Sequence, residues 1–309
     1  MTLRRRLRGA AALAAAALLL LPALAAGAEE GKEFEPSDEF ALDPYVGIEL
    51  GPLDLSINKA VVYLMLASAI CIGVGIFVVR GGLRLRPTRA QNLIEVLYEF
   101  AENQIGRQTL PAKAMGRYFP YVATLFLFIL VSNLISFVPL PVGHESSLGP
   151  IPDFALYAAT ANINVTLALA LVTFVITHVE GVRAHGVGGY LKSWIPGGTG
   201  GVMGGLIWVL EALSQLLRLV SLSVRLFANL LAGHLLIIMA GGFSILLGSF
   251  AGIVAIPFGL FFYVFEWVLV AGLQAFIFAM LSGIYDIVAL LGLGRSATVT
   301  PGIGLEPLL

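Results

Sequence analysis

The sequence predicts an all-α polytopic membrane protein with about five transmembrane helices after signal cleavage. Hydrophobic residues make up 58% of the 309 residues and charged residues only 12%, whereas a soluble domain has about 25% charged residues. Five long apolar segments follow one another, at about 60–79, 118–140, 158–180, 205–240 and 251–293. Each is long enough to cross a hydrocarbon core of roughly 30 Å.

The amino terminus has the pattern of a cleavable signal peptide. Residues 1–28 combine four arginines near the start, an Ala/Leu run and small residues ending at Ala28. The alternative is an uncleaved transmembrane helix, but the apolar run has about a dozen residues and a span needs roughly 20. Residues 29–57 follow as an acidic, proline-containing tail, which we expect to be exported and to have little regular structure.

Charges in the loops predict the orientation of the membrane domain, residues 58–293. The loop between the first two apolar segments is rich in basic residues, whereas the loop from Gly143 to Asp153 has no lysine or arginine. The basic residues are Arg80, Arg84, Arg86, Arg89, Arg107, Lys113 and Arg117. The positive-inside rule places the basic loop in the cytoplasm and the second loop outside. Residues 181–204 are then a cytoplasmic loop, and residues 294–309 a cytoplasmic carboxyl-terminal tail.

Residues 90–108 of the first cytoplasmic loop have the pattern of an amphipathic helix. Apolar residues fall near one side of such a helix and acidic residues near another. The apolar side contains Leu93, Val96, Leu97, Phe100 and Ile105, and the acidic side Glu95, Glu99 and Glu102. We expect this helix to lie along the membrane surface, with a soluble connector as the alternative.

The last two apolar segments are too long to stand upright as straight spans. At 1.5 Å per residue they would reach roughly 54 and 64 Å, against a core of roughly 30 Å. A kink near Gly233, Pro257 or Gly272 is one solution, and strong tilt is the simpler one.

Six polar residues form a stripe on the fourth apolar segment. Spacings of 3, 4, 3, 4 and 4 residues keep them within an arc of about 80° on a helix. They are Glu211, Ser214, Arg218, Ser221, Arg225 and Asn229. His234 points about 180° away from Arg225, so the stripe and the histidine face different surroundings.

Arg225 is the residue of this stripe that most needs an explanation. A charged arginine near the bilayer centre costs at least about 2.5–3.5 kcal/mol, and guanidinium cannot shed its proton. Snorkelling to the interface suits Arg218 better than Arg225. An ion pair with Glu266 or Asp286 on the next segment is a second structural explanation. The functional one is that Arg225 faces a carboxylate of another subunit, with Glu211 and His234 lining water-accessible routes to it.

Four motifs carry a resemblance to a known family. The most specific is LEALSQLLRLVSLSVRLFANLLAGHLL, followed by LQAFIFAMLSGIY and, more weakly, by NINVTLALAL and VGGYLKSW. From about Leu55 to Ile284 the chain resembles subunit a of the F-type ATP synthases, the membrane stator subunit beside the rotating c-ring.

The resemblance implies roles for individual residues. Arg225 matches the essential stator arginine, and Asn229 follows one turn later. His234 falls where many bacterial relatives have glutamate and mitochondrial ones have histidine, and Gln274 matches a glutamine of the last helix. Glu266 resembles the acidic partner of that histidine, but it lies eight residues before Gln274, where the family spacing is seven.

The mechanism implied by the resemblance uses two half-channels. Protons enter from the exported side near Asn229, His234, Gln274 and Glu266, and neutralise a carboxylate of the c subunit. They leave to the cytoplasm near Glu211, Ser214 and Ser221, and Arg225 separates the two routes. The implied partners are the c-ring, the b subunits of the peripheral stalk and the remaining ATP synthase subunits, in a bacterial cell (inner) membrane.

Several other expectations complete the prediction. The sequence has no phosphate-binding loop, so nucleotide chemistry belongs to partner subunits, and we expect no cofactor, metal or nucleic acid. Protons are favoured over sodium because His234 is titratable and no oxygen-rich ion cage is evident. The alternatives are a secondary transporter or ion channel with an anion site at Arg225, which favours inverted repeats, and a structural scaffold whose polar stripe serves helix packing.

Overall fold

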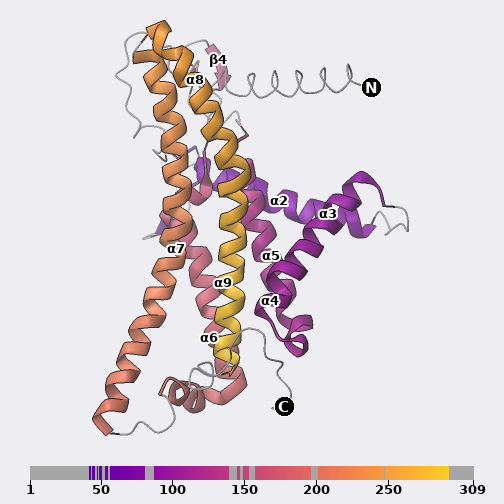
Figure 1. Ribbon diagram of the computed structural model, residues 1–309, viewed down its shortest axis with the longest axis vertical. Helices are drawn as coiled ribbons and strands as arrows, with labels where there is room; N and C mark the ends of the chain where they lie inside the picture. The colour runs from indigo at the N-terminus through magenta and orange to yellow at the C-terminus, as the bar shows by residue number, and fades with distance from the viewer. Residues whose placement is uncertain are drawn as a thin grey trace. The chain divides into compact units, whose positions relative to one another are not determined.

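The chain is mainly helical in the computed structural model (Figure 1), which describes residues 56–80, 87–138, 157–195, 201–246 and 248–291 with several positions between 42 and 54 and between 145 and 152. The predicted all-α class is confirmed. Among the residues that the structure describes, five helical stretches are long and apolar enough to cross a membrane: Lys59–Ile76, Ala112–Ile135, Ile163–Ser193, Gly201–Ala240 and Pro257–Leu290. The proposed signal peptide, most of the acidic tail and the carboxyl-terminal tail lie outside the described residues.

Helices of three kinds and two small hairpins make up the described chain. The α-helices are α2 (Lys59–Arg80), α3 (Arg89–Phe100), α4 (Arg107–Thr109), α5 (Ala112–Ile135), α6 (Ile163–Ser193), α7 (Gly201–Leu246), α8 (Gly248–Phe265) and α9 (Ala271–Leu291). The other helical turns are the π turns η2 (Ala101–Gly106) and η4 (Glu266–Val270) and the 3₁₀ turn η3 (Ala159–Ala161). Strand β1 (Glu49–Leu50) pairs antiparallel with β2 (Leu53–Asp54), and β3 (Glu145–Ser146) with β4 (Gly149–Pro152).

The amphipathic segment forms the predicted helix, α3. Thr88 caps it, because its side chain accepts a hydrogen bond from the backbone N–H of Gln91 at 3.3 Å. Leu93 is 62% exposed and Val96 53%, whereas Phe100 packs against Phe126 and Phe276, so the described chain covers only part of the apolar side of α3. The position of this helix along a membrane surface stays a prediction.

Two predicted boundaries differ from the structure. The region 181–204, predicted as a loop, is helical up to Ser193, and Gly186 breaks this helix with a φ of 70°. Glycine adopts that left-handed conformation without steric cost, so the chain bends there and resumes its helix. The fifth apolar segment is interrupted at η4, whereas Pro257 and Gly272, the positions considered for a kink, lie inside α8 and α9.

The fourth apolar segment forms one uninterrupted helix, α7, with 46 residues. The helix continues through Gly233 without the break in backbone conformation that Gly186 causes in α6. At 1.5 Å per residue, α7 is roughly 69 Å long. A straight helix of that length must tilt or extend beyond a hydrocarbon core of roughly 30 Å.

The chain divides into two compact units, of which the first comprises the residues up to Ile70, Val131–Asn162 and Ala228–Gly272. Its core contains Phe137, Tyr263 and Ala271. The Tyr263 hydroxyl donates a hydrogen bond to the Phe137 carbonyl at 2.7 Å, and the Tyr63 hydroxyl donates to the Val138 carbonyl at 3.2 Å. These bonds fix the end of α5 and the residues after it against α2 and α8.

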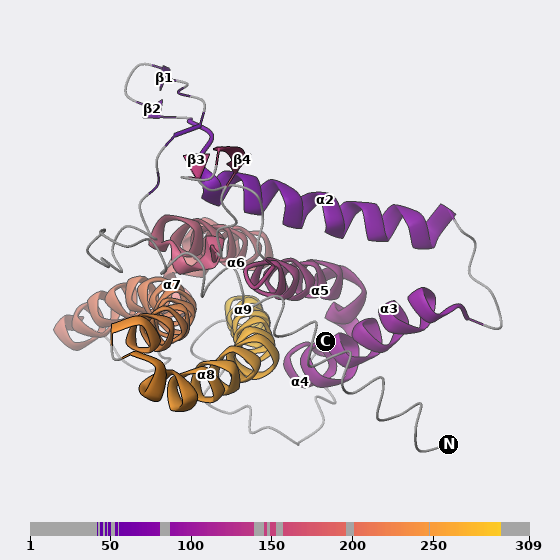
Figure 2. The same cartoon turned by 90° about the horizontal axis from the view of Figure 1, so that it is seen from above.

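The second unit comprises Cys71–Leu130, Ile163–Phe227 and the chain from Leu273 onward. Within it, α6 is bonded to three other helices, and several of the helices are seen nearly end-on in Figure 2. The bonded pairs are Tyr121–Thr173 to α5, Thr166–Ser223 to α7 and Thr177–Asp286 to α9. Helix α6 therefore has polar contacts on several sides. Even so, only 33% of its most apolar stretch is buried.

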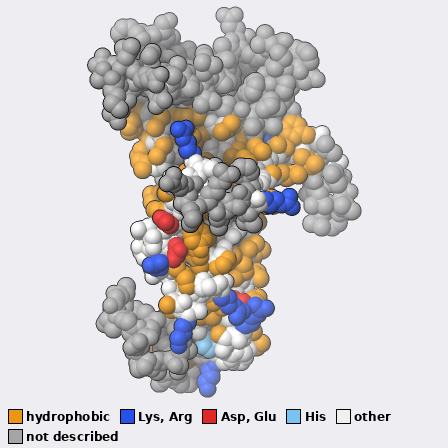
Figure 3. All heavy atoms as spheres, turned by 90° about the vertical axis from the view of Figure 1, so that its right-hand side faces the viewer, with side chains coloured by type: hydrophobic (Ala, Val, Ile, Leu, Met, Phe, Trp, Pro, Cys, Tyr) orange, Lys and Arg blue, Asp and Glu red, His pale blue; other side chains and the backbone are white. Residues whose placement is uncertain are grey.

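Apolar side chains cover much of the described surface on the face shown in Figure 3. Large hydrophobic residues are exposed on several of the long helices; Met65 is 63% exposed, Ile72 62% and Leu217 59%. A soluble monomer rarely exposes extended apolar patches. These surfaces fit contact with lipid or with partner subunits.

Candidate functional site

A buried pair of ionisable side chains lies in the first unit. His234 of α7 and Glu266 of η4 are 5% and 2% exposed. His234 Nδ1 lies 3.1 Å from Glu266 Oε1. Glu266 Oε2 has no hydrogen-bond partner among the described residues. The structure therefore brings together two of the residues predicted for the exported half-channel.

Gly233 allows Glu266 to come this close to α7. A Cβ atom at Gly233 would overlap the carboxyl group of Glu266. Any larger residue at position 233 must push the carboxylate away from its present place. The glycine considered from sequence as a kink site is instead a contact site for the glutamate.

Side chains from α5 and η3 hold the chain that follows Glu266. The Asn133 side-chain amide donates to the Ala271 carbonyl at 3.1 Å, and the Thr160 hydroxyl donates to Asn133 Oδ1 at 2.8 Å. Asn133 and Thr160 are fully buried. The ring centroids of Phe137 and His234 are 5.0 Å apart. The buried pair therefore sits in a fixed surrounding rather than on a loose loop.

The π turn η4 accounts for the unusual spacing between Glu266 and Gln274. The backbone N–H of Ala271 bonds to the carbonyl of Glu266, five residues earlier. This wider turn takes up one residue more than the four-residue repeat of an α-helix. The extra residue between Glu266 and Gln274 is thus accommodated while Glu266 still reaches His234. Gln274 is buried, at 6% exposure.

Arg225 lies on an open face of α7 in the second unit. Its side chain is exposed, and within its unit no described residue pairs with it. Ser221 and Asn229, on the same stripe of α7, are also exposed. Of the two carboxylates considered as ion-pair partners, Glu266 is bonded to His234 and Asp286 to Thr177. The described residues of its own unit therefore give the arginine charge no ion pair.

The beginning of the stripe carries an ion pair and lies beside a small pocket. Arg218 lies 3.6 Å from Glu211 Oε1, and the Gln215 amide donates to the same oxygen at 2.9 Å. The Arg218 guanidinium also lies 5.7 Å from the centre of the Tyr285 ring. Ser214 is half-buried beside this group.

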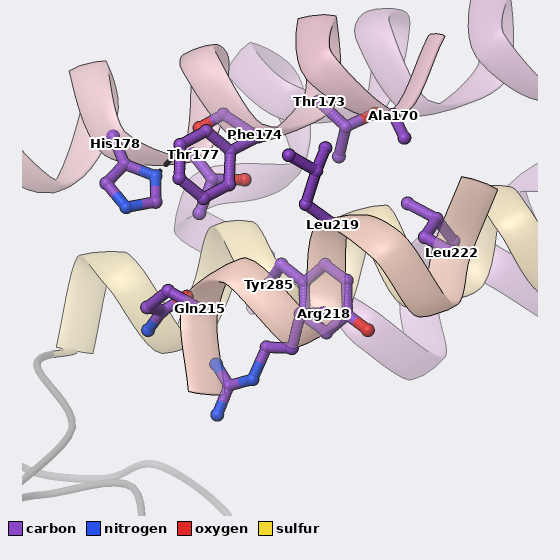
Figure 4. A pocket seen from close by; sticks show the side chains of 10 residues that line it. All are labelled: Ala170, Thr173, Phe174, Thr177, His178, Gln215, Arg218, Leu219, Leu222 and Tyr285. Carbon is purple, nitrogen blue, oxygen red and sulfur yellow. Dashed lines mark hydrogen bonds between the residues drawn. The ribbon is translucent and has the colours of Figure 1, made fainter. Parts of the chain in front are cut away.

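The pocket is lined by residues of α6, α7 and α9 (Figure 4). It has a volume of about 20 Å³, slightly more than the 10–15 Å³ that one water molecule requires. Its polar lining residues are Thr173, Thr177, His178, Gln215, Arg218 and Tyr285. His178 Nδ1 lies 2.8 Å from the Phe174 carbonyl and therefore donates to it. The other ring nitrogen is then available as an acceptor.

Sequence reasoning missed a buried polar cluster elsewhere in the second unit. Asp286 was considered only as a partner of Arg225, and Glu180 was not considered. The Asp286 side chain is fully buried, and Glu180 is 9% exposed. A sequence signal existed, because Thr173, Thr177 and Glu180 are spaced by four and three residues and so share one face of a helix.

Comparison with known proteins matches most of the chain. The model of the family described as ATP synthase A chain matches residues 61–286. The chain is 37% identical over 243 residues to the ATP synthase subunit a of Rubrobacter xylanophilus, covering 78% of this chain and 86% of the relative. It is 35% identical over 263 residues to that of Chloroherpeton thalassium (83% and 73%) and 37% over 262 residues to the ATP synthase subunit a 2 of Prosthecochloris aestuarii (82% and 73%).

Proposed function

The chain belongs to the ATP synthase A chain family, and from this premise we propose that Arg225 couples proton flow to the movement of a partner carboxylate. The chain is a multi-pass membrane protein and the proton-translocating stator subunit of an F-type ATP synthase, and it is part of that complex. We also propose the roles of individual residues, the partner subunits and the orientation of the chain in the membrane.

The exposed charge of Arg225 is the observation that carries the proposal. An arginine in an apolar helix is costly, and no described residue of its unit neutralises it. A carboxylate that approaches from a neighbouring subunit lowers this cost whenever it is ionised. We assign that carboxylate to the c-ring, and we place the b subunits of the peripheral stalk among the remaining partners.

The exported half-channel is proposed to run past His234 and Glu266. A histidine beside a carboxylate passes protons readily, because both groups exchange a proton under mild conditions. The free Oε2 atom of Glu266 leaves one acceptor for water. Asn229 and Gln274 are proposed to line the same route.

The cytoplasmic half-channel is proposed to begin among Glu211, Ser214 and Ser221. The pocket next to Arg218 and Gln215 offers space for one water molecule in this region. Arg225 lies between the two groups along α7, and its fixed positive charge repels a proton that would pass directly between them. A proton can then cross only on the partner carboxylate, which couples ion flow to rotation.

The orientation follows from the loop charges and also stays a proposal. We propose a bacterial cell membrane location, with residues 29–57 exported after removal of residues 1–28. Residues 294–309 are then cytoplasmic, and residues 58–293 form the membrane domain. The basic loop between α2 and α5 supports this orientation.

Replacing Arg225 with alanine tests the proposal. In inverted membrane vesicles that contain the whole complex, Arg225→Ala is expected to abolish ATP-driven proton pumping, measured by quenching of a pH-sensitive dye. Arg107→Ala is the matched control, because the Arg107 side chain is 65% exposed and, among the described residues, pairs with Glu102 alone. Normal pumping by the Arg225 variant would exclude the proposed role. Loss of anion uptake with intact pumping would favour the transporter alternative.

A further inference from the structure

Asp286 is a fully buried carboxyl group in a helix long and apolar enough to cross a membrane. Its Oδ1 atom accepts a hydrogen bond from the Thr177 hydroxyl at 2.8 Å. Its Oδ2 atom is buried without a partner among the described residues, and no described lysine or arginine forms an ion pair with it. An ionised carboxylate in this position would be costly. The side chain therefore holds a proton at rest.

A layer of hydroxyl groups lies one helical turn from this carboxyl group, since Thr173 precedes Thr177 by four residues and Ser282 precedes Asp286 by four. The Tyr121 hydroxyl donates to Thr173 Oγ1 at 3.0 Å, and Thr173 Oγ1 lies 3.5 Å from Ser282 Oγ. Thr173, Ser282 and Thr177 are all buried. Hydroxyl groups donate and accept hydrogen bonds at once, so the layer offers Asp286 a surrounding in which a proton can move.

Glu180 lies on the same face of α6 as Thr173 and Thr177 and pairs with exposed residues of the second unit. The Tyr118 hydroxyl donates to Glu180 Oε2 at 2.8 Å. Arg117 and Arg183 pair with the same carboxylate at 3.2 and 2.7 Å, and their side chains are 62% and 63% exposed. Glu180 also follows Thr177 by three residues on α6, so it lies on the same side of the helix as the hydroxyl that bonds to Asp286.

Thr177 connects the carboxyl group to the pocket of Figure 4. Thr177 lines the pocket together with Thr173, and its hydroxyl is the group that bonds to Asp286. On the other side of the pocket are Gln215 and Arg218, which bind Glu211 of the proposed cytoplasmic half-channel. A water molecule in the pocket would thus lie between the Glu211 group and Thr177.

We propose that Asp286 is a proton-binding group of the cytoplasmic half-channel, linked by Thr177 to water in the pocket and releasing its proton toward Glu180. This inference rests on the proposed stator function. When Asp286 is ionised, Thr177 donates its hydroxyl proton to Asp286 Oδ1 and takes another from a hydronium ion in the pocket. The carboxylate becomes a carboxyl group, the hydronium becomes water and Thr177 is unchanged. In release, the Asp286 carboxyl group gives its proton to a water molecule beside Glu180, so that this water becomes hydronium and the carboxylate is restored.

The test compares Asp286→Asn and Thr177→Val with Glu99→Gln, an acid-to-amide change at an exposed position of α3. Passive proton conductance is measured in inverted vesicles from which the catalytic sector has been stripped. Asp286→Asn keeps the shape and the acceptor for Thr177 but cannot ionise, and Thr177→Val keeps the volume but removes the hydroxyl. Both are expected to lower conductance on the order of tenfold, less than the 10²–10⁴ of a catalytic acid or base because water can partly substitute. Glu99→Gln is expected to conduct like the parent complex.

A second measurement does not depend on transport. Infrared difference spectra of the intact complex, recorded between two pH values, are expected to contain a carboxylic acid band that Asp286→Glu shifts and Asp286→Asn removes. Wild-type conductance in both Asp286→Asn and Thr177→Val, or an unchanged band in Asp286→Asn, would overturn the inference. If Asp286→Asn does not assemble, the Thr177→Val conductance and the band shift in Asp286→Glu decide. Arg225→Ala distinguishes a failure of the stator proposal from a failure of the Asp286 inference. If Arg225→Ala abolishes pumping while Asp286→Asn conducts normally, the stator role stands and only the role of Asp286 fails.

Discussion

Glycine 233 has a function that depends on its lack of a side chain. It lies next to His234, and the carboxyl group of Glu266 occupies the space that a Cβ atom would need. A buried acid can meet a buried histidine here only because one helix position presents bare backbone. At this scale the site is sensitive to a single methyl group.

Replacing Gly233 with alanine is therefore expected to displace Glu266 from His234. Overpacking of this kind costs about 1–3 kcal/mol, and we expect both a lower thermal stability of the complex in detergent and reduced ATP-driven pumping. Gly205→Ala is the control in the same helix, because no atom lies within 4 Å of a Cβ placed there. Equal stability and pumping in the two variants would contradict the proposed role of Gly233.

Helical elements decide which residues of the site can meet. The turn η4 differs from an α-helical turn only in its hydrogen-bond repeat, yet it allows Glu266 to face His234 in spite of the longer spacing to Gln274. Such π turns are frequent at functional sites and rare elsewhere. The eight-residue spacing between Glu266 and Gln274 thus includes a π turn, and the role of Glu266 stays a prediction.

Deleting one residue from η4 tests this explanation. Removing Val268, which is 60% exposed, is expected to convert the turn to regular α-helix. Because the π turn takes up one extra residue, the residues on its two sides keep their relative orientation after the deletion. The His234–Glu266 contact and proton pumping should therefore be retained, whereas insertion of one alanine after Val268 should rotate the two sides by about 100° relative to each other and lower pumping. Loss of pumping after the deletion would contradict this explanation of the spacing.

At the scale of the whole molecule, the exposed apolar surfaces indicate contact with the membrane. The basic loop predicts which side of the membrane each loop occupies. Cys71 is the only cysteine in the chain, so a Cys71→Ala background permits labelling at single new positions. Gln108→Cys is expected to react with a membrane-impermeant thiol reagent only in inverted vesicles, and Glu145→Cys only in intact cells. Both positions should react after the membrane is dissolved. Reaction of both from the same side would refute the proposed orientation.

Sequence periodicity predicted the features that depend on one element at a time. Hydropathy located the five spans, and the 100° repeat of a helix placed the Arg225 stripe and His234 on different faces of α7. The structure agrees, since Arg225 is exposed and His234 is buried. These predictions succeed because an uninterrupted helix has a fixed geometry that does not depend on its neighbours.

The features that sequence could not predict depend on contacts between elements. Nothing in the residues of η4 distinguishes a π turn from an α turn, because the difference is stabilised by contacts such as that of Asn133 with Ala271. The partner of Asp286 was likewise hidden, since Thr177 lies 109 positions away in sequence. Only the packing of α6 against α9 shows that this acid meets a hydroxyl group rather than an arginine.

The unbroken course of α7 has a mechanical consequence. A moving partner that attracts Arg225 exerts a force on this helix, and every turn from Gly201 to Leu246 is joined to the next by backbone hydrogen bonds. The helix has no proline, and Gly201, which has a positive φ, is its first residue, so neither a proline nor a left-handed glycine interrupts its interior. The force is then transmitted along the whole length of the helix. A stator subunit that must stay fixed while the neighbouring ring rotates is better served by one continuous helix than by two shorter ones.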